Sequence, residues 1–456
     1  MADKYDVIVV GAGPGGTTAA KFAAENKLKV LLLERAKEPG DKNMSGSYLF
    51  RKICEECFPG FKDAECHKGM PRWAGIDFRW TLDNDEKVYG VYMGPGSDAM
   101  RDQYSVFRNE TDAWFTNQAV KAGAEFKMAL ATDLIWEKKG TENRVVGVVT
   151  DKGNFEAPVV IDASGLHSII AKKSGLISWR HEKIELGLKY IFKLDPEELR
   201  RRSRVYKDTD GVDVDWGVAP MLCGSCPDHF GCHATVMPER GIISIAYYSS
   251  LSEMIKYRVN VHQRGQWYLK QPQVQALIEG AEFVQCNLHG LAAGDVVGYA
   301  SKSYLPGFMV VGDAGGFAQP ADNYGANVAM YQGKLAGNLA AEMKEKKDYS
   351  EAMFAKYEEG WRNTWIGEDD LHELCVFLRD GSMAGLVWTM DDVVSATFRG
   401  KWNDVGYPAL ILSAIPKLIN ALPAMQTVGY GLKTVSKVGL KKASDLAGLL
   451  GMAAPQ

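Results

Sequence analysis

The feature that most constrains this chain is a glycine-rich turn close to its amino terminus. A short apolar run over residues 7–10 leads into Gly11-Ala12-Gly13-Pro14-Gly15-Gly16, and an alanine-rich segment over 17–25 follows. A second apolar run, 30–33, ends at Glu34. Glycines with this spacing permit a tight turn, close approach of the backbone to a pyrophosphate, and close packing of helix on strand. The pattern predicts a strand–helix–strand unit that binds a dinucleotide, with Glu34 accepting a hydrogen bond from a ribose hydroxyl. The alternative is a glycine-rich turn without a ligand.

A second glycine cluster occurs late in the chain. The apolar run 308–311 precedes Gly312-Asp313-Ala314-Gly315-Gly316, and Gly325-Ala326-Asn327 opens a helical stretch that extends to about residue 344. An acid that follows a buried strand beside a helix amino terminus can hold a ribityl hydroxyl, although a capped helix gives the same pattern. Together with the first turn, this cluster points to FAD rather than NAD. It also predicts a discontinuous nucleotide domain whose last strand comes late in the sequence.

The middle of the chain has a different pattern. Residues 112–122 are predicted to form a helix, and 159–161 another buried strand. From about 184 to 283, strand-like stretches at 186–193 and 241–248 alternate with turns and with a charged helix at 196–204. This segment is predicted to form a second domain, built on a mixed sheet with helices.

Composition excludes several classes of protein. The chain has 456 residues, 24% charged, with a net charge of -4, so no global basic field is available to grip nucleic acid. Eight cysteines are far too few for a disulfide scaffold, and reduced thiols are expected. The first residues lack a secretory leader pattern, and no uninterrupted apolar run is long enough to span a bilayer. We therefore expect a cytoplasmic protein.

Four ordered motifs resemble those of a known family. The chain is similar to FixC and the electron-transfer-flavoprotein:quinone oxidoreductases, within the wider geranylgeranyl reductase and para-hydroxybenzoate-hydroxylase-like flavoproteins. The resemblance covers most of residues 1–345. The motifs that carry it are Gly11–Gly16 with Glu34-Arg35 and Pro39–Gly46, Arg108 followed by Asp112-Ala113-Trp114-Phe115, Ile161-Asp162-Ala163-Ser164-Gly165, and Gly312-Asp313.

The resemblance implies an FAD site and a fold. The fold is α/β with an α+β second domain: a Rossmann-like FAD domain of glutathione-reductase-2 topology, an inserted mixed-sheet substrate domain and a helical carboxy-terminal region. The expected limits are 1–75, 101–180 and 286–345 for the FAD domain, 76–100 and 181–285 for the substrate domain, and 346–456 for the carboxy-terminal region. The residues expected at FAD are Gly11, Gly13, Pro14, Gly15, Gly16, Glu34, Arg35, Lys42, Asn43, Met44, Ser45, Arg108, Ala163, Gly312, Asp313, Gly325, Ala326 and Asn327.

The chain also departs from the family pattern. A family glycine pair is replaced by Gly46-Ser47, and the acid of the 162–165 segment by Ser164. The late cysteine cluster that binds iron and sulfur in the quinone oxidoreductases is not visible, since the last cysteine is Cys375. A signature of the polyprenyl-reducing relatives is not visible at 299–306 either. These departures leave the FAD prediction in place and the substrate open.

The expected function is FAD-dependent transfer of two electrons from a protein or reduced-carrier donor to a buried apolar acceptor. The donor would be an electron-transfer flavoprotein or a ferredoxin, and the acceptor a quinone. The alternatives are a reductase that saturates an isoprenoid or other alkene, a hydroxylase-like flavin monooxygenase, and a non-catalytic electron relay. No catalytic side chain is predicted, because hydride or electron transfer resides in the cofactor.

Two cysteine pairs with the same spacing stand outside this scheme. Cys54 and Cys57 are followed by Cys66-His67, and Cys223 and Cys226 by Cys232-His233. Three interpretations remain open: a shared metal or iron–sulfur site, redox-active thiols near the flavin, and inert buried thiols. We expect no metal, and we keep Cys54, Cys57, Cys223 and Cys226 as the candidates should one bind.

The carboxy-terminal tail has a basic stripe. Lys433, Lys437 and Lys441 recur every four residues, and the apolar segment 408–425 lies just upstream. Such a helix could lie on an anionic membrane or present a solvated face. Peripheral contact with the inner face of the membrane through this region is therefore one of two expectations.

Overall fold

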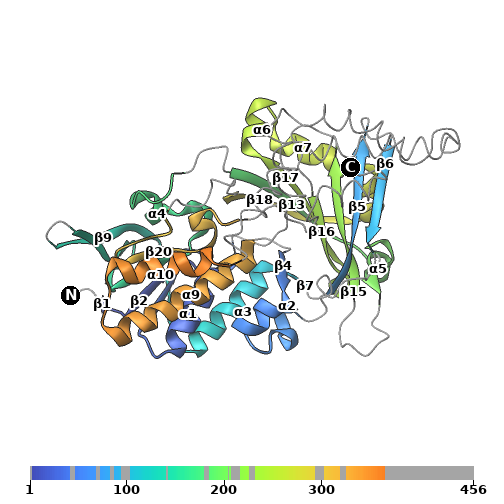
Figure 1. Cartoon of the computed structure of the whole chain (residues 1–456). Helices are drawn as coiled ribbons and strands as arrows, with labels where there is room; N and C mark the ends of the chain where they lie inside the picture. Colours follow the sequence, from blue (N-terminus) through green and yellow to red (C-terminus); the bar gives the residue numbers. More distant parts are fainter. Residues whose placement is uncertain are drawn as a thin grey trace, which may run out of the picture.

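A computed structural model gives the fold of most of the chain. The residues that the structure describes are 3–41, 47–67, 72–82, 87–93, 103–139, 142–178, 184–203, 205–206, 216–224, 232–292, 302–318 and 325–364. Figure 1 shows two bodies, one built around α1 and α9 and the other around a large twisted sheet.

The first body contains a six-stranded sheet in the order β19-β20-β12-β2-β3-β8. All neighbouring pairs are parallel except β19 with β20. Every residue of β2, β3, β12 and β20 is buried, which explains why these strands read as continuous apolar runs without alternation. The strands are β2 Val7–Val10, β3 Val30–Glu34, β8 Glu125–Met128, β12 Val159–Asp162, β19 Tyr304–Leu305 and β20 Phe308–Val310. Because β20 pairs with β12, the late completion of the nucleotide domain is confirmed.

Helices cover this sheet, and glycines allow two of them to pack very closely. A Cβ on Gly333 would lie 2.2 Å from the carbonyl oxygen of Gly15, and one on Gly337 would lie 2.6 Å from that of Ala19. The helix that carries the first turn therefore touches the late helix backbone to backbone. The helices are α1 Pro14–Glu25, α2 Arg51–Cys57, α3 Arg108–Lys121, α9 Gly325–Lys346 and α10 Glu351–Arg362.

The last described helix completes the core of this body. In α10, Trp361 is fully buried, donates its indole N–H to the Ser303 hydroxyl at 2.9 Å, and meets the Phe317 ring edge-on at 4.9 Å. The Tyr357 hydroxyl donates to the carbonyl oxygen of Val310 at 2.7 Å. The carboxy-terminal region thus begins as part of the nucleotide domain's core.

A four-stranded sheet lies beside the six-stranded one, in the order β1-β11-β10-β9. Its inner side chains form one hydrophobic cluster with those of β2, β3, β12 and β20, and α4 packs on β9. The elements are β1 Asp3–Lys4, β9 Ala131–Lys139, β10 Glu142–Thr150, β11 Gly153–Glu156 and α4 Ile169–Lys173.

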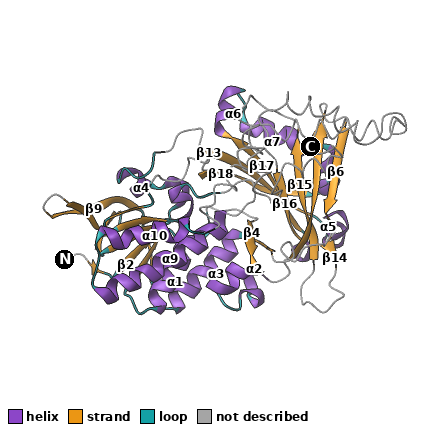
Figure 2. Ribbon diagram, in the orientation of Figure 1, coloured by secondary structure: helices purple, strands orange, loops and turns teal. Residues whose placement is uncertain are grey.

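The second body contains a ten-stranded mixed sheet. Its main path runs β18-β13-β17-β16-β15-β5-β7-β4, with β14 beside β15 and β6 beside β5. Figure 2 shows this sheet as the long orange strands that extend away from the helical body. The strands are β4 Ser47–Phe50, β5 Arg72–Leu82, β6 Lys87–Met93, β7 Gln103–Val106, β13 Ile184–Lys193, β14 Val205–Tyr206, β15 Trp216–Gly224, β16 Cys232–Met237, β17 Ile242–Ser250 and β18 Glu282–Ala292.

Helices cover one face of this sheet over β13, β16 and β17. Leu188, Tyr190 and Phe192 point to that face and pack with side chains of the helices. Figure 1 shows α6 and α7 on the side of β13 and β17 away from the first body. The helices are α5 Pro196–Ser203, α6 Leu251–Lys256, α7 Val261–Leu269 and α8 Pro272–Ile278.

Two short strands from segments that the sequence assigns to the FAD domain take part in the second sheet. β4 pairs with β7 and β7 with β5, while Leu49, Tyr104 and Val106 of these strands pack with side chains of α2 and α3. These strands have only four residues each, and their partners are distant in sequence, so no local pattern reveals which sheet they join. The domain limits stay predictions.

The apolar stretch 408–425 and the lysine stripe at 433–441 lie outside the described residues. Within the described part of the chain, none of the helices has the length and hydropathy required to cross a bilayer.

Candidate functional site

The glycine turn between β2 and α1 is held by backbone contacts that tolerate no side chain at two positions. Gly11 has φ +101°, and a Cβ there would lie 2.4 Å from the carbonyl oxygen of Ala163. A Cβ on Gly16 would lie 1.9 Å from the carbonyl oxygen of Gly11. Gly13 differs, because its Cβ would meet only the Arg108 guanidinium, at 3.7 Å. The turn is therefore closed on its inner side and open at Gly13.

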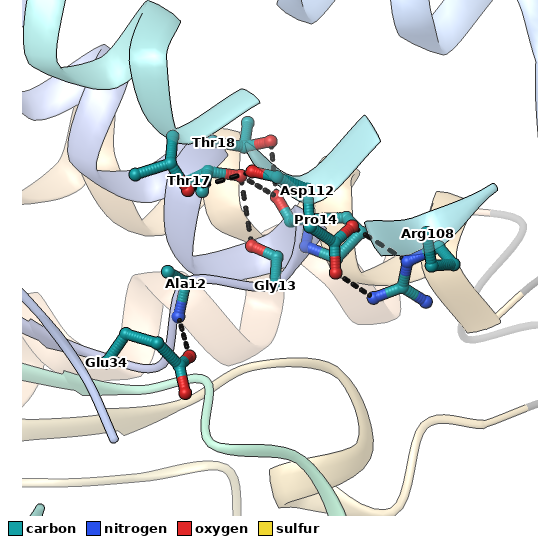
Figure 3. Close-up of polar contacts among 9 residues, drawn as sticks. Ala12, Gly13, Pro14, Thr17, Thr18, Glu34, Arg108 and Asp112 are labelled. Carbon is teal, nitrogen blue, oxygen red and sulfur yellow. Dashed lines mark hydrogen bonds and ion pairs between the residues drawn. The ribbon is translucent and has the colours of Figure 1, made fainter. Parts of the chain in front are cut away.

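The amino terminus of α1 is available to an anion. Pro14 occupies the first turn, Gly13 is the N-cap, and no described side chain caps the helix or places an acid in its first turn. The Thr17 and Thr18 hydroxyls instead donate hydrogen bonds to the carbonyl oxygens of Gly13 and Pro14, at 3.0 Å and 2.6 Å (Figure 3). Uncapped N–H groups and the positive end of the helix dipole then face the open side of the turn.

Glu34 lies at the end of β3 with its carboxylate turned toward the glycine turn. Its Oε2 accepts a hydrogen bond from the Ala12 amide at 2.9 Å (Figure 3). Its Oε1 accepts one from the Ala36 amide, also at 2.9 Å. The residue is 3% exposed. Because each carboxylate oxygen has a second lone pair, the group can still accept from a ligand hydroxyl.

Arg108 is fixed beside Gly13 by a two-pronged ion pair. Its Nε and Nη2 donate to the two carboxylate oxygens of Asp112 at 2.8 Å and 2.9 Å, one turn further along α3 (Figure 3). Burial acts to lower the pKa of Arg108, but the carboxylates of Asp112 and Asp313 outweigh it and raise the pKa above its ordinary value. A permanent cation is thus held at the mouth of the turn.

The late glycine cluster reaches the same place. Gly312–Gly315 form a short 3-10 helix, η7, which begins with Gly312 at φ +61°. The Gly312 amide donates to Oε1 of Gln332, on α9, at 2.8 Å. Asp313 lies in electrostatic range of Arg108. At the start of α9, Asn327 accepts from the Phe50 amide at 2.8 Å, so this side chain ties α9 to β4.

A cleft opens beside the turn along the carboxyl ends of β2, β3 and β12. One wall is polar, with Glu34, Ser164 and His167, and the others are largely apolar. The lining residues are Val10, Gly11, Leu33, Glu34, Arg35, Ala129, Leu130, Ala131, Ser164, His167, Ile169 and Ile170. Apolar walls with a carboxylate at the rim suit a flat aromatic base joined to a ribose.

Two buried polar atoms near the cofactor elements have no hydrogen-bond partner among the described residues. They are the Ser164 hydroxyl, in the segment after β12, and Nε2 of Gln332, whose other amide atom holds η7. Buried polar atoms are almost always paired in native proteins. Such unpaired atoms, the uncapped helix and the open face of Gly13 together fit a bound dinucleotide cofactor.

The structure gathers most of the predicted residues at one edge of the six-stranded sheet. The first turn, Glu34-Arg35, Arg108, Ala163 and Gly312-Asp313 come together there. Residues 325–327 form the start of α9, where Asn327 bonds to the Phe50 amide. Residues Lys42, Asn43, Met44 and Ser45 lie outside the described residues.

Three thiols form a buried thiol cluster, which we define as Cys54, Cys57 and Cys66. They lie in an aromatic core with Phe58, Phe61 and Phe115. Burial raises the pKa of Cys54 well above its usual value and the pKa of Cys57 and Cys66 to about 12. Protonated buried thiols are poor nucleophiles and poor metal ligands, which favours the inert interpretation for these three.

The second cysteine pair is described only in part. The backbone of Cys223 lies in β15, its side chain is not described, and Cys226 lies outside the described residues. Within the part of the chain that the structure covers, no three His, Cys, Asp or Glu side chains are placed to hold a metal ion.

Sequence reasoning missed two side chains. Gln332, fully buried in α9, anchors η7. Lys189, in the middle of β13, is only partly exposed and lies in electrostatic range of Arg108. The signal for Lys189 was present: a single cation in the otherwise apolar run Leu186–Phe192. Its pKa is lowered to about 7, first by desolvation and then by the positive charge of Arg108.

Comparisons with known proteins agree with this geometry. The family profile for FAD dependent oxidoreductases matches residues 6–179. A probable electron transfer flavoprotein-quinone oxidoreductase, YdiS of Escherichia coli K12, is 29% identical over 81% of this chain and 84% of its own. Protein FixC of Azotobacter vinelandii is 27% identical over 81% of this chain and 83% of its own.

Solved structures extend the likeness at the level of the fold. A geranylgeranyl bacteriochlorophyll reductase-like protein from Thermoplasma acidophilum has a TM-score of 0.67 at 20% identity and covers 99% of this chain and 100% of its own. The flavin-dependent brominase Bmp2 has a TM-score of 0.62 at 19% identity, over 84% of this chain and 92% of its own.

The fold and the site define an FAD-dependent oxidoreductase. Within that class, the chain is similar to YdiS and FixC, and the resemblance to these proteins read from its motifs is confirmed. Its activity is FAD-dependent electron transfer.

Proposed function

We propose that this protein passes two electrons from a reduced protein donor, through FAD, to a quinone. The observation that carries the proposal is the extent of the similarity to YdiS and FixC. It spans 376 residues, far more than the 6–179 segment matched by the general FAD profile, so it includes residues outside the cofactor cradle. The donor in this proposal is an electron-transfer flavoprotein or a ferredoxin.

In this proposal each part of the cradle has a defined task. The open face of Gly13 and the uncapped N–H groups of α1 receive the pyrophosphate, and Arg108 adds a positive charge there. Glu34 accepts from a ribose hydroxyl, and Asp313 from a ribityl hydroxyl. The remaining proposed contacts are Gly11, Pro14, Gly15, Gly16, Arg35, Lys42, Asn43, Met44, Ser45, Ala163, Gly312, Gly325, Ala326 and Asn327.

The bound cofactor supplies the two-electron chemistry, and the chain supplies position and dielectric. Asp112 keeps Arg108 aimed at the turn, because the pair is bidentate and Asp112 is only 1% exposed. Gln332 keeps η7 in place through the Gly312 amide. The second sheet lies against this region, since β18 contacts η7 and the 3-10 helix η4, Gly165–His167.

An anaerobic reduction series tests the proposal. The purified holoprotein is reduced with candidate electron-transfer flavoproteins and ferredoxins, and flavin absorbance is followed after a soluble quinone is added. Rapid reoxidation by the quinone is the expected result. A reduced flavin that ignores quinones but reacts with an isoprenoid alkene would assign the protein to the reductase alternative. Coupled consumption of oxygen and NAD(P)H would assign it to the monooxygenases.

Cytoplasmic location and peripheral membrane contact through residues 408–450 complete the proposal. Sedimentation of the full chain with anionic vesicles, compared with neutral vesicles, tests the contact. We expect the protein to bind anionic vesicles but not neutral ones. Salt at about 0.5 M should abolish this binding, because it screens the attraction between surface charges.

A further inference from the structure

The second body carries an exposed turn, both apolar and basic, at the end of α6. We call Ile255, Lys256, Tyr257 and Arg258 the α6 tip, and all four side chains are exposed. Ile255 is 56% exposed and Tyr257 is 45% exposed, so two large apolar side chains lie two residues apart in solvent. Lys256 Nζ lies over the Tyr257 ring, 4.7 Å from its centroid. The α6 tip thus combines apolar surface with positive charge.

Backbone hydrogen bonds hold the α6 tip in one conformation. The Arg258 amide donates to the carbonyl oxygen of Ile255 at 3.2 Å, and the Val259 amide donates to that of Met254 at 2.8 Å. Arg258 has φ +54°, the left-handed conformation that follows the last turn in this type of helix end. Met254 is buried, and Val259 packs on the same core. The tip is therefore a preformed surface, and little ordering is needed when it binds a partner.

The sequence around the α6 tip is strongly basic. Residues 254–278 contain no Asp or Glu, although the chain as a whole has a net charge of -4. The basic residues of this stretch are Lys256, Arg258, His262, Arg264 and Lys270. Glu253 immediately precedes the stretch, and its side chain is not described. A local excess of positive charge favours an anionic partner.

The type of helix end does not by itself distinguish the α6 tip. At the end of α9, Lys347 has φ +53°, and the amides of Lys347 and Asp348 donate to the carbonyl oxygens of Lys344 and Met343. Lys347 is exposed as well, but Glu345 and Asp348 lie close to it in sequence. None of the described side chains between 341 and 350 is large, apolar and exposed. What sets the α6 tip apart is exposed apolar surface together with positive charge that no neighbouring acid in the sequence offsets.

The position of the α6 tip indicates what kind of partner it fits. α6 packs on β13 and β17, and Figure 1 shows it at the outer edge of the second body, with these strands between it and the first body. A redox protein docked at the tip would have the sheet between its own cofactor and FAD, although electron transfer requires close approach. A surface that only anchors the protein has no such requirement.

We propose that the α6 tip docks the protein on a bilayer that contains anionic phospholipid. Lys256 and Arg258 pair with headgroup phosphates, and Ile255 and Tyr257 enter the boundary between headgroups and acyl chains. This contact is separate from the one proposed for residues 408–450, and it does not depend on the quinone function.

Sedimentation of the full-length holoprotein with vesicles tests the inference. Vesicles of equal parts phosphatidylglycerol and phosphatidylcholine are compared with vesicles of phosphatidylcholine alone. Arg258→Gly removes one cation and relieves a left-handed backbone, and Lys347→Gly does both at the end of α9, so it is the matched control. Tyr257→Ser removes an exposed aromatic ring, and Trp136→Ser, at a 44% exposed position on β9, is its control.

The proposal predicts a difference within each matched pair. Arg258→Gly should lower the partition coefficient for anionic vesicles about fivefold, the usual effect of one cation near such a surface, whereas Lys347→Gly should leave it unchanged. Tyr257→Ser should lower the coefficient too, and Trp136→Ser should not. The two glycine variants should change the free energy of unfolding in urea alike, because each relieves the same backbone conformation. Weaker vesicle binding by Arg258→Gly alone is then not a consequence of unfolding.

Other results would overturn the inference. Equal vesicle affinity of Arg258→Gly and Lys347→Gly would mean that the α6 tip is not the contact. If Arg258→Gly keeps its vesicle affinity but binds a reduced electron-transfer flavoprotein more weakly, the tip is a protein-docking surface instead. Loss of binding in a variant with Lys433, Lys437 and Lys441 replaced by Gln, with no loss in the tip variants, would assign the whole contact to the carboxy-terminal tail.

The proposed function is measured separately. The rate at which a soluble quinone reoxidises the reduced flavin requires no vesicles, so failure of the membrane contact leaves the quinone proposal standing. A parent that binds neither kind of vesicle would overturn this inference and the contact proposed for residues 408–450 together.

Discussion

Replacement of Gly13 by alanine is expected to separate cofactor binding from folding. Gly13 has φ -77° and ψ -179°, an extended conformation that alanine adopts without strain. The added methyl group would lie 3.7 Å from the nearest atom, Nη2 of Arg108, which is ordinary van der Waals contact. The flavin-free protein should therefore lose at most about 1 kcal/mol, the approximate preference for glycine over alanine at an N-cap.

The cost to FAD binding should be much larger. The methyl group occupies the open side of the turn, where the backbone and the uncapped N–H groups face the proposed pyrophosphate. Displacing the phosphate weakens charge-assisted hydrogen bonds worth about 1.5–3 kcal/mol each. At about 1.4 kcal/mol per tenfold change, the Kd for FAD should rise about 10- to 150-fold.

The assay pairs two titrations of the same sample. FAD is titrated into flavin-free protein by fluorescence, and urea unfolding of that protein gives its free energy of unfolding. Gly360→Ala in α10 is the matched control, because its Cβ would lie 3.6 Å from a Leu335 methyl group at an ordinary helical position. It should leave the Kd unchanged and add up to about 1 kcal/mol of stability. Unaltered FAD affinity in Gly13→Ala would refute the placement of the pyrophosphate.

Four further outcomes are expected from the same geometry. Gly16→Ala forces a Cβ to 1.9 Å from a carbonyl oxygen and should destabilise the flavin-free protein by about 1–3 kcal/mol in urea; unchanged stability would contradict the tight turn. Asp112→Asn leaves the buried Arg108 cation without its carboxylate and should lower the free energy of unfolding by about 3 kcal/mol. Asp133→Asn, in an exposed ion pair, should lower it by less than about 1 kcal/mol. Equal decreases for the two variants would contradict the buried ion pair. The buried thiol cluster should resist a thiol reagent at pH 8 that labels the exposed Cys286, as peptide mass spectrometry can read out. The pKa values of these thiols are raised in the folded protein, so their contribution to the free energy of unfolding is complete below about pH 9 and is lost toward pH 12. The urea concentration at the midpoint of unfolding should therefore decrease as the pH rises over that range.

The cofactor cradle was largely predictable because most of its determinants are local. The strand before Gly11, the turn and the helix after it are contiguous, and the constraints on Gly11 and Gly16 lie within a few residues or at the end of the neighbouring strand β12. Carboxyl ends of parallel strands meet at one edge of the sheet, so Glu34 and Asp313 could be assigned to one site before their distance was known.

Other features depend on pairings between distant segments. β4 and β7 join the second sheet through partners that no short pattern specifies. The close contact of α1 with α9 depends on Gly333 and Gly337, which in sequence look like ordinary helix interruptions. The carbonyl oxygens that they approach are more than 300 residues away in the chain.

The sequence by itself determined the cofactor class, the class of enzyme and the α/β architecture. These depend on residue types at fixed short spacings, where backbone geometry leaves few solutions. The tertiary structure alone decided that the cysteines near α2 are buried thiols and that Gln332 anchors η7 through the Gly312 amide. Burial, and the charge that a side chain meets, are set by strand register and by packing between bodies; a linear pattern carries neither.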